Sequence, residues 1–561
     1  MATDAESAAS NIALAVKESG DMPMRVLVKV VGDPSPNADS TEADPFDVLH
    51  VIYDVFNDPK EGFETQALFD LIRANGFRLT DPRLRDFLTQ LNDARRANRK
   101  VTKDEFISMI SSEQIPLVRK ILQRQCVVTD WEFFSSNVQQ VFDKCKSETG
   151  GEVTDSNAEF QSKDPNLYGA AVCSIDGQRK SFGDAKTKFC VHSISKAFTY
   201  AINLTHLGAK TVHAHIGTEP SGRGANEICL DKENKPHNPL INTGAIVCAS
   251  LVKRELCIAD RFNFISAEFS KMAGGEHVGF DQAVFLASRE QADRNYALAY
   301  YMRENGNFEE DADIRTALEF YFQLCSIEVT CESLSVMAAT LANGGVCPLT
   351  GEKCLSNEAC RDTLSLMHSC GMYDYSGMFA FKVGIPSKSG VSGGLIVVVP
   401  NVCGFAVYSP PIDDFRNSVK GTRFCQELVN TFNFHNYDNL MRQSTKIDPR
   451  TNMQDKKWEA ITDLLFAAKA GDLSAVRTFY GQGMDINTCD YDGRTALHIA
   501  ASEGHIDLVR YLVRTCGANQ GAVDRWGNTP LEDARNFGQP EVERLLLRSL
   551  DKHKVSTIIR E

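Results

Sequence analysis

The chain has 561 residues, of which 43% are hydrophobic and 24% charged, and its formal net charge is −14. That length suits three or four domains, and that composition suits a globular protein with a core large enough for an enzyme. The acidic balance excludes nucleic acid and anionic membranes as main partners, because both require a concentrated basic face. No apolar run reaches about 18 residues, so we expect no membrane span.

The N-terminal stretch, residues 1–45, is predicted to be flexible because it is rich in turn formers and acids, as in residues 32–40. Its early acidic residues, Asp4, Glu6 and Glu18, fit neither a secretory signal nor an Arg-rich mitochondrial presequence. Taken alone, this segment predicts a cytoplasmic protein. The 17 scattered cysteines lack Cys-x-x-Cys spacing, which is typical of reduced intracellular thiols.

Residues 46–149 show apolar stripes at helical spacing, for example over 68–72, 84–91 and 106–110, and we predict a helical bundle there. The segment 57–62 resembles an EF-hand loop, but it lacks oxygen ligands at alternate positions and the closing acidic residue. We therefore interpret this region as an EF-hand-like bundle that packs or pairs subunits, without a calcium role.

Residues 150–435 combine strands at both ends with helices between them. Residues 168–175 and 178–182 form one expected hairpin around Asp176-Gly177, and residues 395–399 and 404–408 form another. Strands placed this way predict an α+β domain whose sheet is closed by segments distant in sequence.

The C-terminal part contains an internal repeat. Residues 490–498 match residues 524–532, 34 positions later, in the pattern of an ankyrin repeat. We predict a linker at 436–458, ankyrin repeats at 459–550 with two clear units and one partial unit, and a tail at 551–561. Thr495 and His498 are expected to be structural, and the repeats are expected to offer a surface for a protein partner.

A helix predicted to begin at Ser193 carries the strongest catalytic signal. Ser193 and Lys196 lie three residues apart on one helical face, and a lysine made neutral by burial can activate a serine hydroxyl. Lys388-Ser389-Gly390 leads into the apolar strand at 395–399, and Tyr373 lies between these motifs as a possible proton carrier. His213 and His215 have no third ligand in view, so we predict no metal site.

Several longer stretches resemble the glutaminase family, whose members have a β-lactamase-like serine hydrolase fold. The helical region before them and the ankyrin repeats after them match the order found in the animal kidney- and liver-type glutaminases. The stretches are Lys235-Pro236-His237-Asn238-Pro239, Asn242-Thr243-Gly244-Ala245-Ile246, Asp293-Arg294-Asn295, Tyr321-Phe322-Gln323, Ser369-Cys370-Gly371-Met372-Tyr373 and Lys388-Ser389-Gly390-Val391.

The resemblance implies hydrolysis of L-glutamine to L-glutamate and ammonia. Ser193 would attack the side-chain amide, and Lys196 and Tyr373 would move its proton to the leaving ammonia. Backbone N–H groups of Ser193 and Val391 would form the oxyanion hole. No cofactor is implied, since the serine and its neighbours supply the whole mechanism.

The resemblance also implies a set of residues that binds the substrate, a homotetramer and a mitochondrial location; the N-terminus leaves the cytoplasm as the alternative. Asn242, Asn295 and Tyr321 would hold the amino-acid head of glutamine. The full implied substrate-binding set is Ser193, Asn242, Asn295, Tyr321, Tyr373 and Val391.

Some positions depart from the family pattern. Ser156 stands where a tyrosine is usual, His192 stands where glutamine is common, and Ser288 replaces a glutamate expected to face the substrate's ammonium group. Loss of that carboxylate would weaken binding, unless Glu290 compensates. We interpret His192 as a neutral, amide-like substitute for glutamine.

The loop at 223–229 departs as well. It lacks the family's aromatic residues and has Glu227 in place of a lysine linked to phosphate activation and filament formation. The reversed charge predicts weak or absent phosphate activation.

Three functions remain compatible with the sequence. The first is a glutaminase with altered affinity. The second is an amidase that acts on a substrate without the α-ammonium group, and the third is a non-catalytic glutaminase-like paralogue with a regulatory or scaffolding role.

Overall fold

The computed structural model describes residues 49–50, 53–54, 56–58, 62–122, 125–154, 163–224, 227–438, 446–451, 453–481 and 483–558. The chain forms two compact units, Met1–Arg450 and Thr451–Glu561, so the division falls inside the predicted linker. The predicted flexible stretch at 1–45 lies outside the described residues. No helix in the described part is long and apolar enough to cross a membrane.

The predicted helical stripes fall in three helices of the first unit. Their apolar residues, including Leu68, Leu84 and Phe106, form a core of their own. The EF-hand-like segment begins and ends in two short antiparallel strands, and residues 59–61 between them lie outside the described residues. The elements are β1 (Asn57–Asp58), β2 (Gly62–Phe63), α4 (Thr65–Ala74), α5 (Arg85–Arg96), α6 (Lys103–Ser108) and α7 (Ile115–Leu122).

A five-stranded antiparallel sheet organises the α+β domain, in the order β5-β4-β11-β10-β9. The early hairpin β4–β5 pairs with the late strands β10 and β11, for example Val172 with Phe405, so the prediction that distant strands close the sheet is confirmed. The strands are β4 (Gly169–Ser174), β5 (Arg179–Gly183), β9 (Ser387–Ser389), β10 (Gly394–Val399) and β11 (Cys403–Tyr408).

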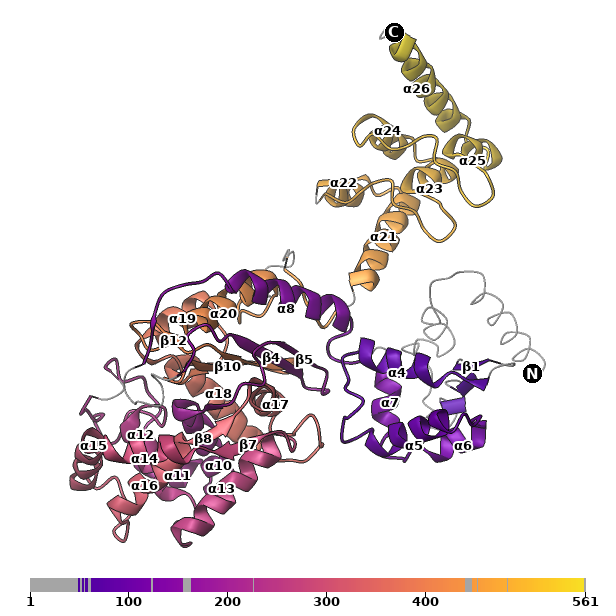
Figure 1. Cartoon of the computed structure of the whole chain (residues 1–561). Coiled ribbons are helices and arrows are strands. Elements are labelled where there is room, and N and C mark those ends of the chain that lie inside the picture. Colours follow the sequence, from indigo (N-terminus) through magenta and orange to yellow (C-terminus); the bar gives the residue numbers. More distant parts are fainter. Residues whose placement is uncertain are drawn as a thin grey trace. The chain divides into compact units, whose positions relative to one another are not determined.

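Helices cover both faces of this sheet, which explains why the strand at 395–399 is apolar at every position (Figure 1). Successive strand residues point to opposite faces. Leu395 and Val397 pack with α8 (Trp131–Cys145) and α20 (Val419–Thr431), whereas Ile396 and Val398 pack with α17 (Cys331–Ala342) on the other side.

One glycine sets how closely α17 approaches the sheet. A Cβ atom on Gly404 of β11 would lie 2.3 Å from the backbone nitrogen of Ala339 in α17. Any side chain there would force the helix away from the sheet.

Helix α10, whose residues from Ser195 to Leu204 are all buried, lies among several of the remaining elements of this domain. The remaining elements include the three-stranded sheet β6-β8-β7 and the two-stranded sheet β12-β3. The strands are β3 (Glu152–Val153), β6 (Phe189–Cys190), β7 (Val278–Phe280), β8 (Ile327–Val329) and β12 (Pro411–Ile412). The helices are η1 (His192–Ile194), α10 (Ser195–Leu207), α11 (Ala209–His215), α12 (Asn242–Leu251), α13 (Ile258–Met272), α14 (Gln282–Glu290), α15 (Asp293–Glu304), α16 (Ile314–Cys325), α18 (Asn357–Cys370), η2 (Tyr373–Tyr375) and α19 (Ser376–Lys382).

The second unit consists of stacked helix pairs, as the repeat predicts. The Thr495 hydroxyl lies 2.9 Å from Nδ1 of His498, whose Nε2 lies 3.2 Å from the Asn528 carbonyl in the next repeat, so both residues have the predicted structural role. The predicted tail begins within the last helix. The helices are α21 (Met453–Ala470), α22 (Leu473–Gly481), α23 (Ala496–Glu503), α24 (Ile506–Arg514), α25 (Pro530–Asn536) and α26 (Pro540–Ile558).

Candidate active site

Ser193 lies in a sharp turn between β6 and α10. His192, just before it, has a φ of 43°, in the left-handed region that few non-glycine residues adopt. Ser193 is half-buried in η1, and Lys196 follows in the first turn of α10 with only 3% of its surface exposed. The hydroxyl can therefore be reached from outside, while the amine that would activate it lies in the protein interior.

Burial gives Lys196 the properties of a base. Desolvation disfavours its charged form and lowers its pKa to about 8, against a small opposing effect of the Cys325 thiol. The Lys196 amine donates a hydrogen bond to Oδ1 of Asn242. A substantial neutral fraction therefore exists near physiological pH, as activation of a serine requires.

Asn242, the first residue of α12, contacts three other predicted site residues from three other helices. Its Oδ1 accepts hydrogen bonds from Lys196 in α10 and, at 3.3 Å, from the Tyr321 hydroxyl in α16. Its Nδ2 donates at 3.5 Å to Oδ1 of Asn295 in α15. The sequence predicted these four residues from separate motifs, and the fold brings them together.

Tyr373 lies next to Ser193 in a second strained turn. Its φ is 52°, and its carbonyl accepts a 2.6 Å hydrogen bond from the Ser376 hydroxyl, which holds the turn. Burial raises the pKa of the phenol to about 12, and the nearby Ser193 hydroxyl opposes that rise. Apart from the nearby Ser193 hydroxyl, the buried phenol oxygen has no hydrogen-bond partner in the described part of the chain.

A second buried lysine, Lys388 of β9, lies behind Tyr373. Its amine is 4.4 Å from the centre of the Tyr373 ring and donates hydrogen bonds to the carbonyls of Gly371 and Ser389. Burial, and after it the charge of Lys196, holds the Lys388 pKa well below its usual range. Sequence reasoning identified the Lys388 motif but not this contact, which only the tertiary fold creates.

Val391 lies in the turn between β9 and β10, against the Ser193 segment. On one side, the Ser392 hydroxyl donates a 2.8 Å hydrogen bond to the Cys190 carbonyl. On the other, a Cβ atom on Gly390 would lie 2.8 Å from the Val191 carbonyl oxygen. The turn that contains Val391 is therefore held next to the segment that carries Ser193.

The departures from the family pattern differ in their placement. His192 is buried, and desolvation, followed by the charge of Lys196, lowers its pKa to about 4, so its ring is neutral at pH 7. Ser288 is half-buried in α14, while Glu290 is exposed at the end of that helix, which gives no support for compensation by Glu290. Ser156 lies outside the described residues.

In the loop at 223–229, Glu227 interacts with groups of its own loop. Its carboxylate accepts a 3.0 Å hydrogen bond from the Gly224 amide and lies 4.0 Å from the Arg223 guanidinium. Residues 225–226 lie outside the described residues. Glu227 thus interacts with a backbone N–H group and a guanidinium of its own loop.

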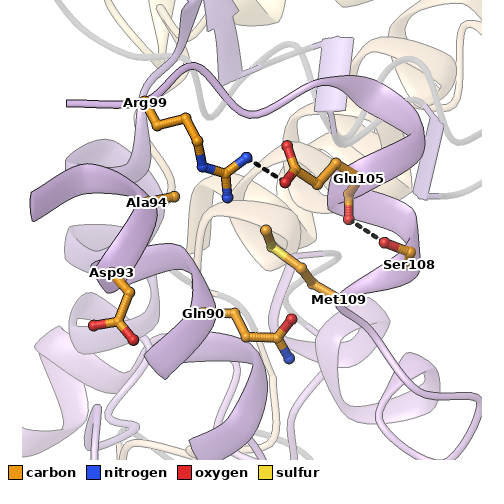
Figure 2. A pocket seen from close by; sticks show the side chains of 7 residues that line it. All are labelled: Gln90, Asp93, Ala94, Arg99, Glu105, Ser108 and Met109. Carbon is orange, nitrogen blue, oxygen red and sulfur yellow. Dashed lines mark hydrogen bonds and ion pairs between the residues drawn. The ribbon is translucent and has the colours of Figure 1, made fainter. Parts of the chain in front are cut away.

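A cavity of about 400 Å³ lies in the helical region, between α5 and α6 (Figure 2). Its walls include an ion pair between Arg99 and Glu105, and the Ser108 hydroxyl donates a 2.8 Å hydrogen bond to the Glu105 carbonyl (Figure 2). None of its seven lining residues is a lysine, so this cavity does not contain a serine–lysine pair like that of Ser193 and Lys196. The lining residues are Gln90, Asp93, Ala94, Arg99, Glu105, Ser108 and Met109.

The two histidines considered for metal binding lie in α11 and have other partners. His213 contacts the Tyr200 hydroxyl at 3.1 Å, and His215 lies 3.4 Å from the Glu309 carboxylate. Among the described residues, no three His, Cys, Asp or Glu side chains are grouped to hold a metal ion.

The burial of Lys196 predicts a gain in stability when its amine is removed. The pKa of Lys196 is lower in the folded state than in the unfolded chain. At pH 7 protonation of this amine therefore stabilises the unfolded state more than the folded state. Lys196→Met should raise the free energy of unfolding at pH 7 by up to about 3 kcal/mol. Tyr321 still donates to Asn242 in that variant.

Urea unfolding at several pH values checks this expectation. The gain should shrink as pH rises from about 8 towards 10.5, where the amine is neutral in both states. Lys180→Met, at an exposed position of β5, is the matched control and should change little. Equal or lower stability of Lys196→Met at pH 7 would contradict a desolvated amine.

Comparisons with known proteins agree with this geometry. The family model "Glutaminase" matches residues 151–437, ankyrin repeats (3 copies) match 464–557, and an EF-hand domain matches 48–129. The mitochondrial liver isoform of glutaminase from Mus musculus is 46% identical over 487 residues, which cover 86% of this chain and 81% of that one. A glutaminase of Nostoc sp. is 40% identical over 302 residues, covering 54% of this chain and 89% of its own.

Among solved structures, "Mglu in its tris and glutamate form" superposes with a TM-score of 0.51 at 30% identity, covering 55% of this chain and 68% of that chain. The fold shared with glutaminase structures is β-lactamase-like. The serine, the buried lysine and the asparagine–tyrosine cluster lie within the matched domain. This chain is an amidohydrolase and belongs to the glutaminase family.

Proposed function

We propose that this protein hydrolyses the side-chain amide of L-glutamine to L-glutamate and ammonia, with Ser193 as nucleophile and Lys196 as base. One observation carries the proposal. Lys196 is buried one helical turn from Ser193, with its pKa lowered to about 8, and is hydrogen-bonded to Asn242.

In the first half-reaction, Ser193 Oγ attacks the amide carbon while its proton passes to the neutral Lys196 amine. The tetrahedral intermediate then collapses, the carbon–nitrogen bond breaks, and ammonia leaves with a proton delivered by Lys196 through Tyr373. The product is an ester of Ser193. In the second half-reaction, water attacks this ester, Lys196 accepts a proton from the water, and Ser193 Oγ leaves with a proton as glutamate is released.

Each tetrahedral intermediate carries a negatively charged oxygen, which is stabilised by hydrogen-bond donors that are positioned before the reaction begins. The backbone N–H groups of Ser193 and Val391 are proposed to supply them, supported by the contact of the Gly390–Ser392 turn with the Ser193 segment. Such a donor typically lowers the barrier by about 3–4 kcal/mol.

Asn242, Asn295 and Tyr321 are proposed to hold the amino-acid head of the substrate, because their polar groups meet beside Lys196. Ser288 leaves the α-ammonium group without a carboxylate at that position. We therefore propose a glutaminase with reduced affinity. The same observation favours one second candidate, an amidase for a substrate without the α-amino group, and a substrate screen with and without that group separates the two.

We also propose a homotetramer, a mitochondrial location and a protein partner that binds the ankyrin repeats. The first rests on the family resemblance and the second on relatives named as mitochondrial isoforms. The third rests on the match of 464–557 to ankyrin repeats. Light scattering of the purified protein and microscopy of the tagged full chain test the first two.

Ammonia release from L-glutamine tests the chemistry directly. Ser193→Ala should lower kcat by about 10⁴-fold or more, since the covalent route is lost. In the unchanged enzyme kcat/KM should rise with pH, with a midpoint near 8, because only neutral Lys196 accepts the proton. A glutamine-analogue electrophile should label Ser193. Full activity of Ser193→Ala would refute the mechanism.

The substrate's ammonium group provides a second prediction. Ser288→Glu should lower KM for glutamine roughly tenfold or more, because a carboxylate would again pair with that charge. Glu290→Gln, at an exposed position of the same helix, should leave KM unchanged. A KM that does not respond to Ser288→Glu would place the ammonium group elsewhere and favour the second candidate.

A third prediction concerns regulation. Phosphate should stimulate the purified protein weakly or not at all, because Glu227 adds negative charge and engages Arg223 and the Gly224 amide. Glu227→Lys should make activity respond to phosphate, whereas Glu233→Lys, an exposed neighbour, should not. A several-fold stimulation of the unchanged protein would refute the prediction.

A further inference from the structure

A small cavity lies between α10, α12 and α16, and Lys196 is among the residues that line it. Its volume is about 10 Å³, close to the minimum that holds one water molecule. The lining residues are Ser195, Lys196, Thr199, Ala245, Cys248, Tyr321 and Leu324.

Thr199 is one of the residues that line this cavity. Thr199 is 3% exposed and follows Lys196 by three positions in α10, so the two share a helical face. Its Oγ1 has no hydrogen-bond partner among the described residues. Thr205 in the same helix instead donates to the Ala201 carbonyl at 2.9 Å, the usual arrangement for a helical threonine.

An unpartnered buried hydroxyl is costly unless water satisfies it. A water in this cavity would have polar partners within reach, because three of the lining residues, Thr199, Tyr321 and Lys196, each carry a hydroxyl or an amine. The Lys196 ammonium has three N–H donors, of which one points to Asn242.

We propose that one water molecule occupies this cavity, hydrogen-bonded to Thr199 Oγ1 and Lys196 Nζ, and that Thr199 is thereby a positioning residue for Lys196. The inference rests on the proposed role of Lys196 as the base. When Lys196 takes the proton of Ser193, the water accepts a hydrogen bond from the new ammonium group. It thus stabilises the charged form at the moment of reaction, without touching the substrate.

Other groups around Lys196 also influence its charge, and Thr199 substitutions leave them in place. Lys196 lowers the pKa of His192 and of Lys388, and the Cys325 thiol raises that of Lys196. The titratable groups around Lys196 are His192 of η1, Lys388 of β9, Cys325 and Tyr321 of α16, Tyr373 of η2 and Cys248 of α12. The Cys248 sulfur accepts a hydrogen bond from Asn203.

Three variants of the full-length protein test the proposal. Thr199→Val removes the hydroxyl at nearly constant volume, and Thr199→Ser keeps it. Thr363→Val is the matched control, because Thr363 of α18 is equally buried, has an Oγ1 without a partner among the described residues, and does not line the cavity. The measurements are the pH dependence of kcat/KM on glutamine and high-resolution crystal structures.

Loss of the water should disfavour the ammonium form, so Thr199→Val should move the midpoint of kcat/KM to lower pH by about one unit. Thr199→Ser and Thr363→Val should keep the midpoint of the unchanged enzyme. A purely structural role of Thr199 would reduce the yield of folded protein without moving the midpoint. Density for the water should be present in the unchanged enzyme and absent from Thr199→Val.

An empty cavity in the unchanged enzyme, or a midpoint that Thr199→Val does not move, would overturn the proposal. Failure of the proposed function has a different signature, since Ser193→Ala would then keep its activity. The crystallographic result can be read in either case, because it does not depend on turnover.

Discussion

The site depends on keeping a lysine amine in the protein interior, one helical turn from a serine. Water would hold the Lys196 amine charged near its ordinary pKa, where it could not accept a proton at neutral pH. The packing of α10 among α12, α16 and the central sheet excludes bulk solvent from the amine and lowers its pKa to about 8. Desolvation of this group works against folding, so the surrounding core must offset it.

Because the Lys196 amine is buried, the polar groups near it need hydrogen-bond partners within the protein. Asn242 accepts from both Lys196 and Tyr321 and reaches Asn295, so one amide organises three helices around the base. On the opposite side of Ser193, Tyr373 adopts a left-handed conformation between Ser193 and the buried Lys388. Backbone strain persists only where the surroundings enforce it, and such strain is concentrated at functional sites.

The antiparallel sheet supplies the rigid frame. Because β4 pairs with β11, and β11 with β10, strands more than 200 residues apart are neighbours, and β9 follows at the edge. This order places the turn that holds Val391 against the segment that holds Ser193. The departures at His192 and Ser288 lie in η1 and α14, outside the five strands of this sheet.

Much of this architecture follows from sequence alone, because it depends on local patterns. Apolar runs and turn residues predicted the two hairpins, helical spacing predicted α10, and the 34-residue repeat predicted a structural role for Thr495 and His498. The family motifs predicted Ser193, Lys196, Asn242, Asn295, Tyr321 and Tyr373. What local patterns could not reveal is which side chains lose contact with water. The lowered pKa of Lys196, the neutral ring of His192 and the contact of Lys388 with Tyr373 each arise from segments distant in sequence, and only the tertiary structure decided them.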